Sequence, residues 1–170
     1  YLDVVVAPDD AHVASSALDE ETDEPGVAVF GLGGVKAGAL EHFFALPAEP
    51  VAWLDARRCL LWADATKTAY VVDIGSGATT PLEARQRPLL GADRSLLVTV
   101  DATSRVRVVD AATLATRATI DAPVTKDASV TLGAGDSMVV IADEDASTLA
   151  TLDGAVRGRI PLGTHSSDPT

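Results

Sequence analysis

The 170-residue chain is poor in several residue types, and each shortage excludes a class of protein. It has one cysteine, Cys59, which rules out an internal disulfide and a zinc site built from several cysteines. No stretch reaches the roughly 18–20 consecutive apolar residues that a membrane-spanning helix requires. Lysine and arginine number 13 against 25 aspartates and glutamates, and the net charge of -12 argues against a nucleic-acid groove.

The rest of the composition is that of a protein with a hydrophobic core. Apolar residues make up 47% of the chain and the mean hydropathy is +0.21, so the chain can fold as one domain despite its charge. The chain opens at Tyr1, and its single methionine is Met138. We therefore expect a processed or excised piece that is part of a larger chain or complex.

Two series of aspartates show that the chain is built from repeats. The first series is Asp64, Asp101 and Asp143, at intervals of 37 and 42 residues. The second series is Asp73, Asp110 and Asp153, at intervals of 37 and 43 residues. The N-terminal segment fits as a longer fourth copy, in which Asp19 opens an acidic insertion 45 residues before Asp64. A common period of about 40 residues in independent markers indicates a repeat architecture.

Each copy contains four short apolar runs separated by turn residues. In the copy around Asp64 the runs are 51–54, 59–63, 69–72 and 79–82. Valine, threonine and leucine dominate these runs, as is typical of strands, while glycine, aspartate and serine mark the breaks. A sustained helical period is absent, so the sequence predicts an all-β fold of four-stranded antiparallel sheets.

Four strands every ~40 residues are the signature of a β-propeller blade. The frame resembles the WD-repeat superfamily and its bacterial YVTN-type relatives, although Val72-Asp73, Val109-Asp110 and Leu152-Asp153 replace the Trp-Asp dipeptide. The resemblance implies β-propeller blades belonging to a seven- or eight-bladed ring. A closed four-bladed ring and a self-associating half-propeller are the alternatives. The expected blades are approximately 2–49, 50–86, 87–123 and 124–163, followed by a polar tail, 164–170.

One segment also resembles the start of a dinucleotide-binding domain. Residues 27–35 read as a strand followed by a glycine turn, and 37–46 could form the next helix. Lys36 stands where such a turn needs a third glycine, and no alternation of strands and helices follows. The propeller interpretation is therefore preferred.

Residues with catalytic or metal-binding chemistry form no convincing pattern. The histidines His12, His42 and His165 have no metal-ligand spacing, and 143–147 opens like a calcium loop but lacks its glycine and distant glutamate. No serine stands in a G-x-S-x-G context. Cys59, between Trp53 and Trp62, is expected in the core. We predict no catalytic, cofactor-binding or metal-binding residue, no cofactor, and no enzymatic activity.

Acids concentrate in the turns that follow the second strand of each copy. In a propeller these turns project from one face, and here they contain only two bases, Lys67 and Arg105. We predict that this face receives a basic segment of a protein partner. The predicted partner-binding acids are Asp19, Glu20, Glu21, Asp23, Glu24, Asp64, Asp101, Asp143, Glu144 and Asp145.

The predicted function is that of a non-catalytic scaffold that presents propeller loops to protein partners. The alternative is an extracytoplasmic propeller enzyme, or a ligand or metal carrier, with a site in the central channel. The expected innermost strands, near 4–6, 51–54, 88–90 and 129–132, consist almost entirely of apolar or small residues, which favours the scaffold. The residues expected to be buried between blades are Leu61, Val71, Val72, Val98, Val108, Val109, Val140 and Ile141.

Overall fold

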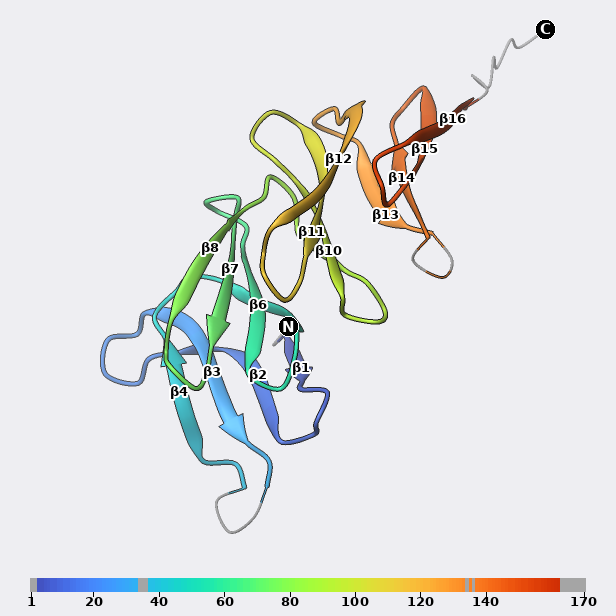
Figure 1. Cartoon of the computed structure of the whole chain (residues 1–170). Coiled ribbons are helices and arrows are strands. Elements are labelled where there is room, and N and C mark those ends of the chain that lie inside the picture. Colours follow the sequence, from blue (N-terminus) through green and yellow to red (C-terminus); the bar gives the residue numbers. More distant parts are fainter. Residues whose placement is uncertain (1–2, 34–36, 134, 136, 163–170) are drawn as a thin grey trace, which may run out of the picture.

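The computed structural model describes residues 3–33, 37–133, 135 and 137–162, and these form sixteen strands in four sheets. Within each sheet the strands follow chain order and pair with their neighbours in antiparallel fashion. We number the sheets blade 1 to blade 4, from the blue N-terminal sheet to the red C-terminal sheet in Figure 1. The described residues contain no α-helix, which confirms the all-β prediction.

The strand bounds are as follows. Blade 1 consists of β1 (Val4–Val6), β2 (His12–Leu18), β3 (Pro25–Gly31) and β4 (Leu40–Phe44). Blade 2 consists of β5 (Glu49–Trp53), β6 (Arg58–Ala63), β7 (Thr68–Asp73) and β8 (Thr79–Glu83). Blade 3 consists of β9 (Leu89–Leu90), β10 (Leu96–Val100), β11 (Arg105–Asp110) and β12 (Thr116–Pro123). Blade 4 consists of β13 (Ser129–Leu132), β14 (Met138–Ala142), β15 (Ala146–Thr151) and β16 (Val156–Pro161).

The antiparallel sheet of blade 1 excludes a dinucleotide-binding unit. Strand β3 pairs with β2 on one side and with β4 on the other, both antiparallel. The region in which a helix would be needed contains β4 instead. Positions 34–36 of the glycine turn lie outside the described residues.

Three hydrophobic cores lie between successive blades. Because side chains alternate along a strand, a single strand can contribute residues to two of these cores. In β6, Cys59 and Leu61 belong to the core shared with blade 1, whereas Leu60 and Trp62 belong to the core shared with blade 3. Neighbouring side chains of a strand point to opposite faces of the sheet, so a continuous apolar run fills both cores. The third core joins blades 3 and 4 and includes Ile120 of β12.

Seven of the eight predicted core residues are buried. The exception is Val140, which is half-buried, while its neighbours Val139 and Ile141 are buried against blade 3. The prediction was wrong at Val140 because alternation along β14 turns this residue to the face of blade 4 that points away from blade 3.

The second series of repeat aspartates holds the turns between the third and fourth strands. The Oδ1 atom of Asp73 accepts hydrogen bonds from the backbone N–H groups of Gly75 and Ser76, both at 2.9 Å. Asp110 accepts equivalent bonds from Ala112 and Thr113, at 2.9 and 2.8 Å. The backbone bond from Thr113, together with side-chain hydrogen bonds from Arg117 and Thr113 and the charge of Arg117, lowers the pKa of Asp110 to about 2. The repeat period therefore reflects a local turn requirement for an aspartate side chain.

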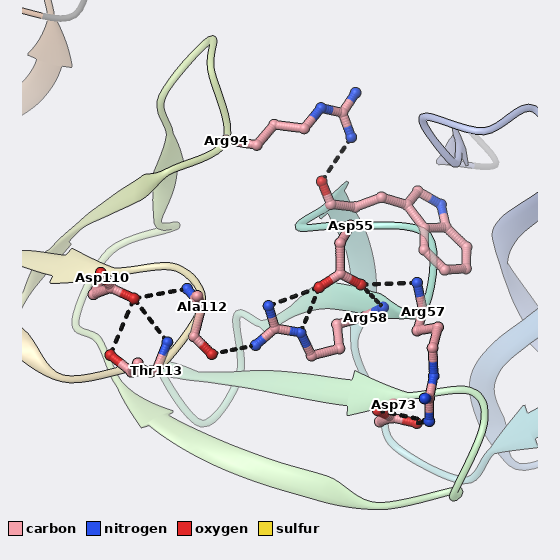
Figure 2. Close-up of polar contacts among 9 residues, drawn as sticks. Asp55, Arg57, Arg58, Asp73, Arg94, Asp110, Ala112 and Thr113 are labelled. Atoms are coloured by element: carbon pink, nitrogen blue, oxygen red, sulfur yellow. Dashed lines mark hydrogen bonds and ion pairs between the residues drawn. The ribbon is translucent and has the colours of Figure 1, made fainter.

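Polar contacts add to the core between blades 2 and 3 (Figure 2). Asp55 Oδ2 accepts a 2.7 Å hydrogen bond from Arg58 Nε, and Arg58 Nη1 donates to the carbonyl of Ala112 in blade 3 at 2.8 Å. In the opposite direction, Arg94 Nη1 of blade 3 donates to the carbonyl of Trp53 at 2.8 Å. The two arginines thus connect the adjacent blades across their shared edge.

Candidate functional site

The turns that carry the predicted acids all open at the same end of their sheets. Second and fourth strands of an antiparallel sheet run in the same direction, so the turn after the second strand lies beside the connector to the next blade. We call this end the turn face. It comprises the turns 19–24, 64–67, 101–104 and 143–145 and the connectors 45–48, 84–88 and 124–128. The structure therefore brings the predicted acids to one face, and their binding role stays a prediction.

The blade 1 turn presents four exposed carboxylates on an ordered backbone. Asp19 holds the turn, because its Oδ1 accepts hydrogen bonds from the backbone N–H groups of Glu21 and Thr22, both at 2.9 Å. These two bonds, that from Thr22 foremost, lower the pKa of Asp19. The exposed members are Glu20, Glu21, Asp23 and Glu24. We call 19–24 the acidic loop.

Asp64 is exposed but already has a cationic partner. Its Oδ1 lies 2.6 Å from Lys67 Nζ, and it also accepts a 3.3 Å hydrogen bond from Trp62 Nε1. The hydrogen bond and charge of Lys67 lower the pKa of Asp64. Part of its charge is therefore compensated within the turn.

Asp101 holds its turn rather than offering a carboxylate at the surface. Its side chain is only 2% exposed. The Oδ1 atom accepts hydrogen bonds from Thr103 N and Oγ1 and from Arg105 N, at 2.8, 2.7 and 3.0 Å, while Oδ2 accepts one from Arg107 Nε at 2.9 Å. Burial by itself raises the pKa of Asp101, but these hydrogen bonds and the charge of Arg107 outweigh it, and the pKa lies below the ordinary value.

The blade 4 turn also contains one acid that stabilises the turn by hydrogen bonds and two acids that are exposed to solvent. Asp143 is half-buried, and its Oδ1 accepts hydrogen bonds from Thr125 Oγ1 and from the backbone N–H of Glu144, both at 2.8 Å. Glu144 and Asp145 are exposed. Because Thr125 belongs to the connector between blades 3 and 4, Asp143 ties that connector to the turn.

The connectors bring bases to the turn face in addition to Lys67 and Arg105 of the turns. Arg85, Arg87 and Lys126 line a groove of about 810 Å³ together with Lys67. One of them, Arg87, forms an ion pair with Glu49 at 2.7 Å. The antiparallel order that groups the turns also places the connectors at that end, so the sequence could have predicted these bases. Among the predicted acids, the exposed ones without an ion pair therefore lie in the blade 1 and blade 4 parts of the turn face, and these bases lie between them.

An apolar groove of about 480 Å³ lies beside the acidic loop, between blades 1 and 2. Leu18 and Pro25, which flank the acidic loop, form one part of its lining, and Pro47 and Trp62 form another. Leu18 is 62% exposed. The groove therefore offers open apolar surface next to four exposed carboxylates.

Cys59 and the histidines within the described residues contact other residues of the fold. Cys59 is buried, and burial raises the pKa of its thiol to about 12. His12 stacks on Trp53, and its Nε2 lies 3.3 Å from Glu41 Oε2. His42 stacks on Phe44, and His165 lies outside the described residues. Within the described ranges, no group of three or more His, Cys, Asp or Glu side chains is placed to hold a metal ion. That part of the chain also has no helix long and apolar enough to cross a membrane.

Comparison with known proteins identifies the fold. No family model and no curated protein matches the chain. The crystal structure of BamB from Moraxella catarrhalis superposes on 92% of this chain with a TM-score of 0.63 and 16% identity. Hydrazine synthase of Kuenenia stuttgartiensis superposes on 94% with a TM-score of 0.59 and 12% identity. This chain covers 48% of each of those structures, so it spans about half their length.

Both solved structures are β-propeller proteins, and the four sheets described above are accordingly β-propeller blades. At these identities the likeness establishes the fold alone. The assignment to the WD-repeat or YVTN-type group stays a prediction.

Proposed function

We propose that this chain is a non-catalytic, WD-repeat-like interaction scaffold whose turn face binds a basic segment of a protein partner. The observation that carries the proposal is the position of the acidic loop beside the open apolar groove between blades 1 and 2. The segment that fits this surface has lysines or arginines next to one bulky apolar side chain. The apolar side chain would enter the groove, and the basic side chains would meet the acidic loop.

The electrostatic support comes from the four exposed carboxylates of the acidic loop. Among the described residues, no lysine or arginine forms an ion pair with Glu20, Glu21, Asp23 or Glu24. Their charge is therefore available to a partner. Exposed charges of this kind act mainly on the association rate and on the choice of partner, and salt screens them.

The apolar support comes from the groove itself. Leu18 and Pro47, which are both exposed, contribute apolar surface on two sides, and the groove's volume of about 480 Å³ is within the range of small recognition pockets. Burial of one apolar side chain would give the affinity and register that exposed ion pairs alone do not supply.

The test is the binding of a fluorescent peptide of about a dozen residues, in which lysines surround one leucine, measured by anisotropy at low salt. We expect Glu20→Lys/Glu21→Lys to weaken binding about tenfold, and a peptide with serine in place of the leucine to bind more weakly as well. Asp19 is left intact because it holds the turn.

The matched control is Glu144→Lys/Asp145→Lys, which makes the same charge change at the blade 4 end of the turn face. This variant should change the affinity by less than about threefold, because screened charges far from the groove contribute little. Equal losses in both double variants would show a general charge effect and overturn the proposed site. So would equal affinity for the leucine and serine peptides.

A further inference from the structure

The terminal blades have the sequence pattern of interior blades but lack a neighbour on one face. In interior β10 all five residues from Leu96 to Val100 are buried, because blades 2 and 4 cover its two faces. In β14 all five residues, Met138 to Ala142, are also apolar, yet only Val139 and Ile141 are buried. A continuous apolar run is typical of a strand covered on both faces. The pattern of β14 therefore indicates a missing neighbour.

Strand pairing defines the uncovered face of blade 4. Residues paired directly across neighbouring strands point to the same side of the sheet. The residues paired with Val140 and its alternates point away from blade 3. They are Ser129, Thr131, Met138, Val140, Ala142, Ser147, Leu149, Thr151, Gly158 and Ile160. We call this set the blade 4 end face.

Blade 1 has an equivalent face that points away from blade 2. Strand pairing assigns to it Val4, Val6, Val13, Ser15, Ala17, Gly26, Ala28, Phe30, Leu40 and Phe43. We call this set the blade 1 end face. Val4 and Leu40 are 55% and 56% exposed, and Ile160 on the blade 4 end face is 53% exposed.

Neither end face contains a charged residue at these positions, although 22% of the chain is charged. Uncharged, partly apolar sheet faces at the two ends of a row of packed blades continue the composition of the interfaces between blades. Exposed apolar patches of this kind mark interaction surfaces.

We propose that a second copy of this chain covers both end faces, with the blade 4 end face of each copy packed on the blade 1 end face of the other. Two four-bladed copies then form one closed eight-bladed ring with two equivalent interfaces, and no apolar end face stays open. Each solved structure that the chain resembles has about twice its length, which is the length that two copies supply.

The first experiment measures the molar mass of the 170-residue chain by light scattering and sedimentation at about 50 µM. We expect the mass of two 17.5 kDa chains. Ile160→Asp should shift the protein toward monomer by placing a charge on the blade 4 end face. The matched control is Val156→Asp on the same strand, where a 47% exposed residue pairs with Ala150 on the opposite side of the sheet. It should leave the dimer intact.

The second experiment is complementation between variants. Val4→Asp damages the blade 1 end face and Ile160→Asp damages the blade 4 end face, so each variant alone has a charge at both interfaces of a dimer. Mixed in equal amounts, they can form a heterodimer in which one of the two interfaces is intact. We expect dimers in the mixture at a concentration at which each variant alone is monomeric. A misfolded variant could not produce this result.

The dimer proposed here and the proposed binding of a basic segment should respond to salt in opposite directions, so a salt titration distinguishes the two proposals. Two copies with a net charge of -12 each repel one another, so raising the salt from about 10 mM to about 0.5 M should strengthen the dimer. The same increase in salt should weaken the binding of the basic peptide to the turn face. A monomer at about 50 µM at both salt concentrations, or a dimer that is unaffected by Ile160→Asp and Val4→Asp, would overturn the proposal.

Discussion

Replacement of Asp101 by alanine should destabilise the protein far more than the same change at Asp64, although the two residues hold the same place in their blades. Asp101 accepts four hydrogen bonds from Thr103, Arg105 and Arg107 and is almost fully buried. A hydrogen bond to a charged group contributes about 1.5–3 kcal/mol, but the four bonds share one turn and are not additive.

The expected loss of stability depends on whether the hydrogen-bond donors to Asp101 find other acceptors in Asp101→Ala. Arg107 keeps a second carboxylate, because its Nη1 lies 3.4 Å from Glu83 Oε2. Thr103 and Arg105 are exposed residues, so water can replace part of the lost bonding to their backbone N–H groups. We therefore expect Asp101→Ala to lower the free energy of unfolding by about 2–4 kcal/mol, well below the simple sum of four bonds.

The assay is urea unfolding followed by tryptophan fluorescence, since Trp53 and Trp62 are both buried in the native state. With a slope of about 2 kcal/mol/M, a loss of about 3 kcal/mol moves the midpoint down by about 1.5 M. Asp64→Ala is the matched control and should move it little, because the Asp64 carboxylate is exposed and pairs with the equally exposed Lys67.

The pH dependence gives an independent check. The pKa of Asp101 is lower in the folded state than its ordinary value of 3.8. Its ionised form therefore stabilises the fold fully above about pH 4, and this contribution disappears as the pH falls through the folded-state pKa. The midpoint difference between wild type and Asp101→Ala should shrink in the same range. Equal midpoints for Asp101→Ala and Asp64→Ala, or a difference that does not change with pH, would refute the reasoning.

Three further predictions concern the interior of the propeller. Leu60→Ala, in the core between blades 2 and 3, should cost about 2–5 kcal/mol in urea unfolding, and a loss below about 1 kcal/mol would contradict the assigned packing. Arg58→Ala removes the contact with the Ala112 carbonyl of blade 3 and should lower the thermal midpoint more than Arg57→Ala, since Arg57 pairs only within blade 2; the reverse order would count against the interblade role. The Cys59 thiol should react with a thiol reagent only after unfolding, because it is buried and its pKa is raised to about 12; rapid reaction of the native protein would exclude the buried position.

The sequence alone was enough to predict the strands, their grouping in fours and the fold class, because these depend on local patterns. Short apolar runs, turn residues and aspartates that bond to the backbone two or three residues ahead all act within a few positions of the chain. A local pattern repeated at a constant period leaves few architectures, and the propeller is one of them.

The environment of individual side chains was decided by the tertiary structure. Asp64 and Asp101 each follow the second strand of a blade, yet one is exposed and the other buried. Six residues after Asp101, Arg107 donates a hydrogen bond to the Asp101 carboxylate. The residue six positions after Asp64 is Tyr70, which makes no such bond to Asp64. The sequence contains that arginine, but its contact with the carboxylate depends on how the two strands pair.

The same holds for the two valines of β14 and for the charge of the turn face. The repeat predicted a strand before Asp143, but only the pairing with β13 and β15 showed that Val139 faces blade 3 and Val140 faces away. Arg85 and Lys126 reach the turn face because the connectors end there, a consequence of strand order rather than of the residues around them. Local hydrogen bonds and side-chain alternation are encoded over a few residues, whereas burial and surface charge depend on which distant strands become neighbours.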